Sequence, residues 1–407
     1  METQTKKEGK VIGNVGILDL RTATDASIAQ IPEICNVGAI IHSPNKAHLV
    51  SLLNMGNLGA VLEVPEETSV RMGQEVLSRD SLKNQAEPLH LLLSGQLIIN
   101  PDVPEADVAQ GLSSLNVLGQ IFFPEHLGGV LQSKLRHLSG QMLAYQYTTL
   151  VAGNLRLDKS QLQALDDNVE LSVIGKLIMP QVLPDDLLVQ KIGNIEVFKE
   201  VICREENAQT LLARLNNKAR TAKITIIPTG FEWVTQPLDL DAAMLAILPG
   251  QKLYCMDRLL IGDDVEAEAL DGALDTLIIK DLLICPARLK AIMARKCNLL
   301  ETKAIFYTGE LWLFDGDFTL TAARFDFLAD KATLVNFGDL TVATDVKPKT
   351  LADRLVRVHN FGDIFGTSQQ NAALQARLGI NEGDLLNTAA FGSDDSPNRI
   401  GNVGHLK

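Results

Sequence analysis

The stretch VLGQIFFP at residues 117–124 carries the pattern that decides the fold. It consists of an apolar run, a glycine, a polar residue and a second apolar run that ends in proline. Close relatives of this phrase return as VIGKLIMP at 173–180, YTGELWLF at 307–314 and NFGDLTV at 336–342. A phrase that recurs along a chain at a steady spacing indicates a stack of similar structural units.

The glycine of this phrase marks one position in each repeat, and the typical spacing of 21 to 24 residues separates six of the thirteen neighbouring pairs of marks. The longer gap after residue 59 contains the polar stretch 66–88, which we expect to be a helical insertion, and the gap after 119 leaves room for an extra turn around Gly140. The marked positions are Gly16, Gly38, Gly59, Gly95, Gly119, Gly153, Gly175, Gly193, Lys223, Asp257, Asp281, Gly309, Gly338 and Gly362.

Side-chain polarity sets the register of each expected strand. The residue two positions after the mark is apolar in 13 of 14 repeats, and the residue four positions after it in 11 of 14. Because residues i and i+2 of a strand face the same side, these columns predict the buried face of a sheet. The stretches 125–137, 206–217 and 348–358 space their apolar residues by three and four, which predicts helices.

The sequence therefore predicts an α/β repeat solenoid of about 14 strand-turn-helix units with a continuous parallel β-sheet. We expect the solenoid over residues 11–380, between a polar N-terminal tail at 1–10 and a polar C-terminal tail at 381–407. A doubly wound α/β enzyme also alternates strands with helices. We prefer the solenoid because one open sheet rarely holds so many strands.

The asparagine that precedes several marked glycines, in residues 36–38, 57–59, 336–338 and 360–362, is similar to a feature of a known class. The unit length, the single strand and the helix also resemble the leucine-rich-repeat class of α/β solenoids. The resemblance is architectural, because here the asparagine comes before the centre of the strand. It implies a binding or scaffolding role and no particular ligand.

Composition and charge exclude several functions. The net charge is −13 and no stretch is strongly basic, which argues against nucleic-acid binding and against docking on an anionic membrane. The polar first ten residues do not predict a signal peptide. Five scattered cysteines without a CxxC pair favour a reducing compartment, so we expect a cytoplasmic protein with no metal and no cofactor, non-classical export remaining open.

No cluster of residues in the sequence predicts catalysis. The seven histidines form no metal-binding motif, and Cys255 and Cys285 read as small core residues in apolar strands. The acidic phrases 263–264 and 315–317 lack the ligand spacing of a calcium loop and fit turns or helix caps. Trp233 and Trp312 are expected to pack rather than to stack on a ligand.

One strand column does suggest an interaction. The residue three positions after the mark should point away from the helices, yet it is apolar in 10 of 14 repeats. A continuous apolar row on an open face is typical of an interaction surface; the alternative is that the subunit itself covers this column. Its apolar members are Ile41, Leu62, Ile98, Phe122, Ile178, Ile226, Leu260, Ile284, Trp312 and Phe365.

A second suggestion comes from the chain end. Ile400, Gly401, Asn402, Val403 and Gly404 repeat residues 12–16 letter for letter. An end of a solenoid is an open edge that accepts a further strand. We expect this phrase either to add as a strand to an end repeat, in a neighbouring molecule if a head-to-tail filament forms, or to be a mobile tail that reuses the repeat phrase.

These patterns favour a non-enzymatic repeat scaffold that acts by protein binding or self-association, with a homo-oligomer or filament as one form. Its expected partners are another protein or other copies of itself, with no nucleic acid and no membrane. Two alternatives stay open: an enzyme whose site is built from loops between repeats, and an exported adhesin or effector of the leucine-rich-repeat type.

Overall fold

The computed structural model describes residues 11–215, 222–387 and 399–406. Its strands form eight sheets, which we group into five consecutive blocks along the chain: 11–63, 69–145, 149–227, 232–307 and 310–387. Contacts divide the chain into two compact units, one with residues 12–229 and 400–407, the other with residues 1–11 and 230–399. The first unit thus contains the first three blocks apart from Val11, and the second unit contains the last two.

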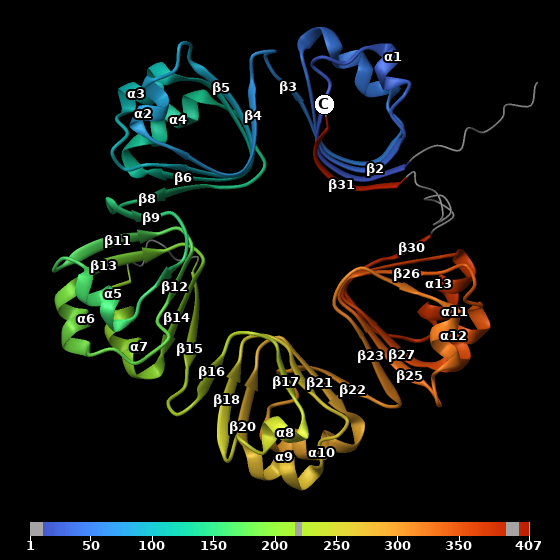
Figure 1. Cartoon of the computed structure of the whole chain (residues 1–407). Coiled ribbons are helices and arrows are strands. Elements are labelled where there is room, and N and C mark those ends of the chain that lie inside the picture. The colour runs from blue at the N-terminus through green and yellow to red at the C-terminus, as the bar shows by residue number, and fades with distance from the viewer. Residues whose placement is uncertain (1–10, 216–221, 388–398, 407) are drawn as a thin grey trace, which may run out of the picture. The chain divides into compact units, whose positions relative to one another are not determined.

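The third block shows how one repeat is built (Figure 1). Strand β11 (Val169–Val173) ends at a bend at Gly175, and strand β12 (Lys176–Ile178) follows in a second sheet. Helix α6 (Asp185–Lys191) then returns the chain to strand β13 (Ile192–Val197), which pairs in parallel with β11. A full repeat of this block therefore has two strands, one on each side of the bend, where the sequence predicted one. In the first two blocks a single strand runs through the glycine as predicted, for example Leu89–Ile99 through Gly95 and Leu112–Pro124 through Gly119.

The first unit begins with the first block, which contains β1 (Val11–Asp19), α1 (Asp25–Ile28), β2 (Glu33–His42), the 3-10 helix η1 (Pro44–Leu52) and β3 (Met55–Glu63). The second block contains β4 (Ser69–Leu77), α2 (Arg79–Lys83), β5 (Leu89–Ile99), α3 (Glu105–Gly111), β6 (Leu112–Pro124), η2 (Glu125–Leu127), α4 (Gly128–Lys134), β7 (Leu135–Leu138) and β8 (Met142–Tyr145). The third adds β9 (Thr149–Val151), β10 (Leu155–Arg156), α5 (Lys159–Ala164), β14 (Glu200–Arg204), α7 (Glu205–Leu212) and β15 (Lys223–Ile227).

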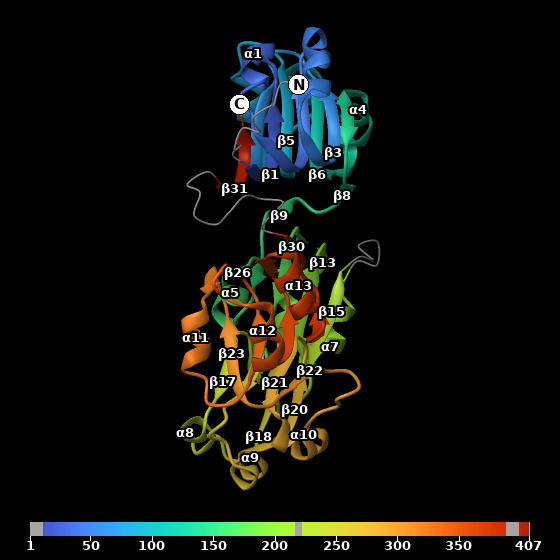
Figure 2. The same ribbon diagram turned by 90° about the vertical axis from the view of Figure 1, so that its right-hand side faces the viewer.

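The second unit begins with the fourth block: β16 (Glu232–Val234), β17 (Leu238–Leu240), α8 (Ala242–Leu245), β18 (Gln251–Cys255), β19 (Leu259–Ile261), α9 (Ala267–Ala273), β20 (Leu274–Ile279), β21 (Leu282–Pro286), η3 (Ala287–Leu289), α10 (Lys290–Lys296) and β22 (Lys303–Tyr307). The fifth contains β23 (Glu310–Phe314), β24 (Phe318–Leu320), α11 (Ala322–Asp326), β25 (Ala332–Asn336), β26 (Asp339–Val342), α12 (Pro348–Arg354), β27 (Leu355–Asn360), β28 (Asp363–Gly366), α13 (Ser368–Gln375), β29 (Leu378–Asn381) and β30 (Leu385–Asn387). Figure 2 shows α11 and α12 beside the strands of this block.

The α/β repeat architecture predicted from the sequence is confirmed in its coarse form. Each strand pair of known register in the described residues is parallel. The expectation of one continuous sheet is wrong, because pairing stops at the end of each block; for example, β3 and β4 are both edge strands. The expected helical insertion at 66–88 is also wrong, since it contains strand β4 and the short helix α2.

The marked glycines stack because consecutive repeats approach closely at the bend. A Cβ atom on Gly119 would lie 1.9 Å from the carbonyl oxygen of Gly95, and one on Gly140 would lie 2.0 Å from that of Gly119. Real Cβ atoms do not tolerate such contacts, so only glycine fits at these bends. Gly140 therefore belongs to an extra turn, as its place in the sequence suggested.

The register predicted for Gly193 is wrong. Lys199, and not Gly193, occupies the bend next to Gly175, since the Lys199 amide donates to the Gly175 carbonyl at 3.2 Å. This repeat has no glycine at its bend, and Gly193 lies inside β13 instead. The sequence search followed the glycine, so it placed this repeat six residues too early.

Helix ends are tied to the neighbouring repeat by a basic side chain. Lys191 Nζ donates to the Leu165 carbonyl at 2.8 Å, Lys296 Nζ to the Asp271 carbonyl at 2.9 Å, and Arg377 Nε to the Ala352 carbonyl at 3.1 Å. In each case the acceptor lies at or near the C-terminal end of the preceding helix, where carbonyl groups lack a partner in the helix itself. These bonds couple consecutive repeats along each block.

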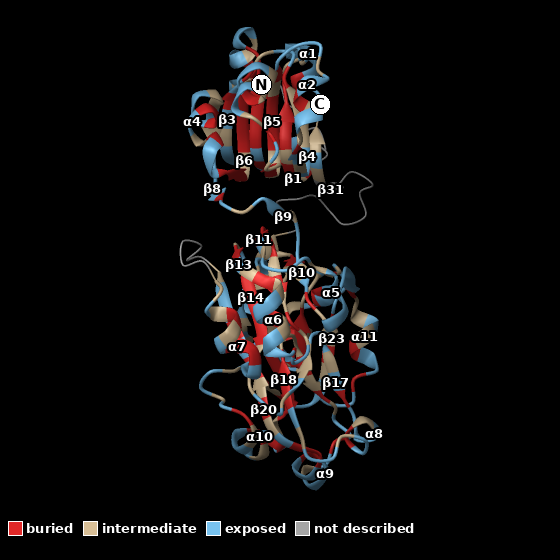
Figure 3. Cartoon of the chain, turned by 90° about the vertical axis from the view of Figure 1, so that its left-hand side faces the viewer, coloured by how far each residue is buried: buried red, intermediate tan, exposed pale blue. Residues whose placement is uncertain are grey.

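The helices cover one side of the strands in each block, and the largest apolar clusters lie between them. Figure 3 shows the strand β5 as buried, while outer helix surfaces such as that of α6 are largely exposed. The second block alone buries 17 apolar residues in one such cluster. Among the described residues, no helix has the length and hydrophobicity needed to cross a bilayer.

Candidate interaction surfaces

The apolar residues three positions after the marks, here called the outward column, were predicted as an interaction surface. Most of them are buried within each unit. The outward faces of successive blocks pack on each other: Ile41 and Leu62 contact a cluster with Leu92 of the next block, and Ile284 shares a cluster with Val335. Eight members of the column lie on the outward face. Six of them are buried, namely Ile41, Leu62, Ile98, Phe122, Ile284 and Phe365, and two are half-buried, namely Ile178 and Leu260. These eight residues do not form an open apolar face, which corrects the expectation of an exposed row.

The junction of the second and third blocks shows why this packing is tight. The rings of Phe122 and Phe198 meet edge to face, with centroids 5.3 Å apart and planes at 84°. Ile98, Tyr145 and Ile174 complete the cluster between the two sheets. Aromatic pairs in this geometry add to the free energy gained by burying their area.

Two members of the column do not lie on the outward face at all. Trp312 pairs with Leu334 and packs in the helix-side core of the fifth block, because β23 begins a new block and does not continue the repeat of Gly309. Ile226 pairs with Cys203, which faces the helix-side core of the third block. A register error of one residue moves a side chain to the other face of a strand.

Exposed apolar side chains instead lie on edge strands, among them β15, where Ile224 and Ile226 are 48% and 38% exposed, and β3. Leu58 and Val61 pair with Val37 and Ile40 of β2, which belong to the helix-side core, but no further repeat covers them. Leu58 is 39% exposed and Val61 is 43% exposed. Among the described residues the backbone of β3 pairs only with β2, so within that part of the chain its other edge also presents unpaired amide and carbonyl groups.

The neighbouring edge strand β4 has charged side chains on its helix side. Arg71 and Glu75 pair with Leu93 and Leu97 of β5, which face the helix-side core of the second block. The two charged side chains form an ion pair with each other. Charged residues that point inward on an edge strand discourage further strand pairing, so β3 and β4 differ in their capacity to bind another strand.

The C-terminal phrase lies in β31 (Arg399–Leu406), which is hydrogen-bonded beside β1 of the same chain. Figure 1 shows this strand against the first block. Val403 and Leu406 pack on the core of that block, and a Cβ on Gly16 would lie 2.5 Å from the Gly404 carbonyl oxygen. The side chains of Ile400, Gly401 and Asn402 lie outside the described residues, as do residues 1–10 and 388–398.

A buried ion pair between Asp19 and Arg21 lies at the end of β1 in the same block. Asp19, at the end of β1, accepts hydrogen bonds from Arg21 Nε at 3.0 Å and Arg21 Nη2 at 2.7 Å. Arg21 Nη1 also donates to the carbonyl of Glu66, at 2.9 Å, in the connection from β3 to β4. Burial raises the pKa of Asp19, but the hydrogen bonds and charge of Arg21, helped by His405, outweigh it and hold that pKa below its ordinary value.

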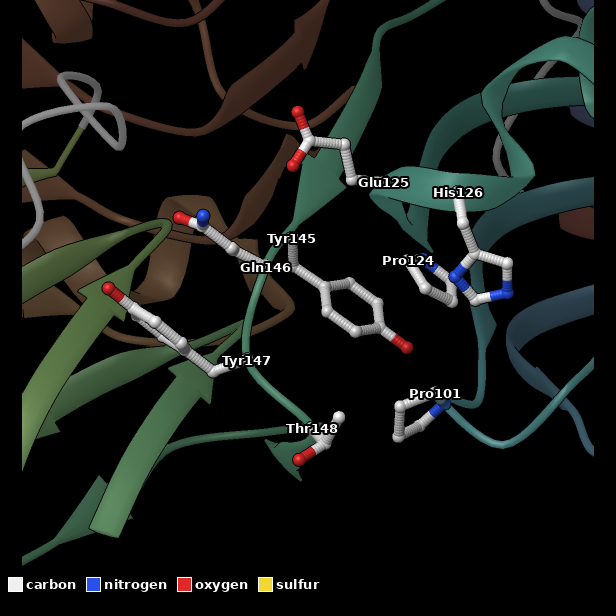
Figure 4. Close-up of a pocket in the computed structure, with 8 residues that line it drawn as sticks. All are labelled: Pro101, Pro124, Glu125, His126, Tyr145, Gln146, Tyr147 and Thr148. Carbon is white, nitrogen blue, oxygen red and sulfur yellow. The ribbon is translucent and has the colours of Figure 1, made fainter. Parts of the chain in front are cut away.

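A cavity of about 390 Å³ opens where the second block connects to the third. Figure 4 shows its lining, with the Tyr145 ring directed into it and the Glu125 side chain turned away from His126. Burial, followed by the charges of Asp102 and Glu196, raises the pKa of Tyr145, whose hydroxyl donates to the Ile99 carbonyl. The lining residues are Pro101, Pro124, Glu125, His126, Tyr145, Gln146, Tyr147 and Thr148.

A buried carboxylate fixes the connection beside this cavity. Glu196 Oε1 accepts hydrogen bonds from the Gln146 amide and from Ser172 Oγ, each at 2.5 Å. The Tyr147 amide donates to Ser172 Oγ at 3.0 Å. Sequence reasoning missed this pair, because a serine and a glutamate 24 residues apart form no motif; their only signal is two polar residues in apolar strands.

The cysteines and acidic residues that the sequence did not predict to be functional have structural contacts. Cys255 and Cys285 are buried in the helix-side core of the fourth block, which confirms their assignment as core residues. Asp264 Oδ2 accepts from the Ala242 amide at 3.0 Å, and Asp315 Oδ1 accepts from Arg258 Nη1 at 2.7 Å. These contacts give both acidic phrases a part in holding neighbouring elements together.

Comparisons of the chain with protein-family models, with curated proteins and with solved structures found no match.

Proposed function

We propose that this chain is a non-enzymatic α/β repeat scaffold that binds protein strands, including those of its own kind, at the open edge of β3. The observation that carries the proposal is the pairing of two features in one strand. Leu58 and Val61 leave apolar surface exposed on the helix side, and the backbone edge beside them is unpaired. An added strand would satisfy both the hydrogen bonds and the apolar surface.

Sedimentation velocity over a wide concentration range tests this proposal. We expect the weight-average mass of the wild-type chain to rise with concentration. We expect the double substitution Leu58→Lys with Val61→Lys to keep the chain monomeric, because two charges on the exposed side chains oppose a new strand. The matched control is Val76→Lys, which alters a side chain of similar exposure on β4 and should leave association unchanged.

A monomeric wild-type chain at all concentrations, with no protection of β3 against hydrogen exchange by any extended peptide, would contradict the proposal. An association that the double substitution leaves intact would move the binding surface away from β3. Hydrogen exchange of residues 55–63 reports directly on the strand concerned.

A second candidate function is the binding of a small molecule, or an enzymatic site, in the cavity near Tyr145. Its support is the gathering of His126, Tyr145 and Tyr147 around a volume of about 390 Å³. Ligand-observed NMR with a fragment mixture tests it. Fragments that bind the wild-type chain but lose binding after His126→Ala would favour this candidate, whereas no binding would remove it.

A further inference from the structure

We propose that the strand received by β3 is the C-terminal strand β31 of a second copy of this chain, added in the register of the existing ladder. The inference rests on the proposed function and names the partner for that same edge. Its argument is the specific chemistry that the end of this sheet requires from an incoming strand.

The first requirement is a glycine at one position. In the first block, Gly404, Gly16, Gly38 and Gly59 stack in that order: a Cβ on Gly38 would lie 2.6 Å from the Gly16 oxygen, and one on Gly59 would lie 2.4 Å from the Gly38 oxygen. A strand added beyond β3 in the same register meets the Gly59 carbonyl in the same way. Any side chain at that position would collide with it.

The second requirement is a hydrogen-bond donor two residues earlier. Asn36 Nδ2 donates to Asn14 Oδ1 at 2.7 Å, and Asn57 Nδ2 donates to Asn36 Oδ1 at 2.8 Å. The ladder runs in one direction, and within the described part of the chain Asn57 Oδ1 accepts no hydrogen bond. An incoming asparagine at this position would supply the next donor.

The third requirement is apolar side chains that match Leu58 and Val61. With Gly404 stacked on Gly16, Val403 falls in the column of Leu58 and Leu406 in the column of Val61, and both already pack on this core in their own chain. The sequence of residues 402–406, NVGHL, therefore meets all three requirements. Burial of such side chains is favourable in proportion to the apolar area removed from water.

The occupant must come from another molecule. The sheet order is β3-β2-β1-β31, so β31 is already paired with β1 and lies at the opposite edge from β3. The two edges of this one sheet are thus complementary to each other. A contact between unlike surfaces of two copies is heterologous, and it propagates head to tail unless it closes into a ring.

A labelled peptide tests the partner directly. We use the full-length chain and a fluorescent peptide of residues 399–406, RIGNVGHL, and measure fluorescence anisotropy. We expect saturable binding that Val61→Lys weakens by about tenfold or more and that Val76→Lys leaves unchanged. The peptide carrying Gly404→Val should not bind, because its side chain would meet the Gly59 carbonyl.

The peptide also separates this inference from the proposed function. We expect excess native peptide to lower the mass of self-associated wild-type chain, while the Gly404→Val peptide does not. Self-association that depends on Val61 but resists the native peptide would overturn the identity of the partner and leave the β3 edge as a binding site. Equal binding of the two peptides, or binding unaffected by Val61→Lys, would also overturn it.

Discussion

At the scale of single residues, glycine is required at those bends where the carbonyl oxygen of the preceding repeat lies too close for a Cβ atom. A Cβ on Gly338 would lie 2.3 Å from the Gly316 oxygen, whereas one on Gly272, in helix α9, would meet no atom within 4 Å. The same substitution should therefore have opposite effects at these two sites of one unit.

We expect Gly338→Ala to lower the free energy of unfolding by about 1–3 kcal/mol, the usual cost of overpacking. Gly272→Ala should raise it by about 0.5–1 kcal/mol, because alanine is the better helix former. Guanidinium unfolding of the two variants measures both values. Equal effects would mean that the stack of glycines does not constrain the bend.

The buried ion pair of Asp19 makes stability depend on pH. Its folded pKa lies below the value of 3.8 expected in the unfolded chain. The group therefore contributes its full stabilisation above pH 3.8 and loses it as the pH falls toward the folded pKa. Asp19→Asn also leaves Arg21 largely buried without its partner.

We expect Asp19→Asn to lower the free energy of unfolding by about 3–5 kcal/mol near neutral pH. The difference in free energy of unfolding between this variant and wild type, measured by urea unfolding, should become smaller below pH 3.8. The exposed Asp25, which pairs with His48 on the surface, provides the control, and Asp25→Asn should change little at any pH. If the loss of free energy of unfolding in Asp19→Asn does not depend on pH, the charge of Asp19 is not the cause of that loss.

The cysteines should differ sharply in reactivity. Burial raises the pKa of the Cys203 thiol to about 11 and the pKa values of the Cys255 and Cys285 thiols to about 12. Cys297 is also buried, and only Cys35 is partly exposed. We expect Ellman's reagent to titrate one thiol in the folded chain and the other four after denaturation. Rapid reaction of a second thiol would place one of these side chains nearer to solvent than the structure does.

At the scale of strands and helices, the interior of each block could be predicted from the sequence, but its ends could not. Leu97, Leu177 and Leu340 lie two residues after a glycine and pack on the helix side, as the alternation of polarity predicted. The short helices at 125–134, 205–212 and 348–354 also fall where the apolar spacing predicted them.

Apart from the register error at Gly193, inside the third block, the errors occur where one block stops and the next begins. Gly309 lies between β22, which ends the fourth block, and β23, which begins the fifth, so the alternation restarts and Trp312 faces inward. Local sequence does not record such a break, because the strands on both sides keep the same apolar composition. The open edge of β3 was missed for the same reason, since only pairing shows which strand is last.

The packing between blocks gives a prediction at this scale. Phe122 is 1% exposed at the junction of the second and third blocks, while Phe327, after helix α11, is 90% exposed. We expect Phe122→Ala to lower the free energy of unfolding by about 3–5 kcal/mol, and Phe327→Ala to change it by about 0.5 kcal/mol or less. Urea unfolding followed by circular dichroism measures both. A small effect at Phe122 would mean that the two sheets do not depend on each other.

At the scale of the whole molecule, the first and the last described strands, β1 and β31, pair in one sheet. Strand β31 completes the first block, so the block that starts the chain is finished only by the last residues. Removal of residues 399–407 should expose the edge of β1 and uncover part of the core cluster that contains Val15 and Leu18, because Val403 and Leu406 pack against this cluster. The fifth block, with its own sheets, keeps all of its strands in the shortened chain.

We therefore expect deletion of 399–407 to accelerate hydrogen exchange in β1 and β2, measured by mass spectrometry, and to leave β25 and β27 unchanged. Added peptide of residues 399–406 should restore the protection of β1, because the sheet edge and its glycine stack remain in place. Val61→Lys should not prevent this restoration, since it alters the opposite edge of the same sheet. Unchanged exchange in β1 after the deletion would mean that β31 adds no stability to the first block, and a second molecule could then gain little by receiving the same strand at β3.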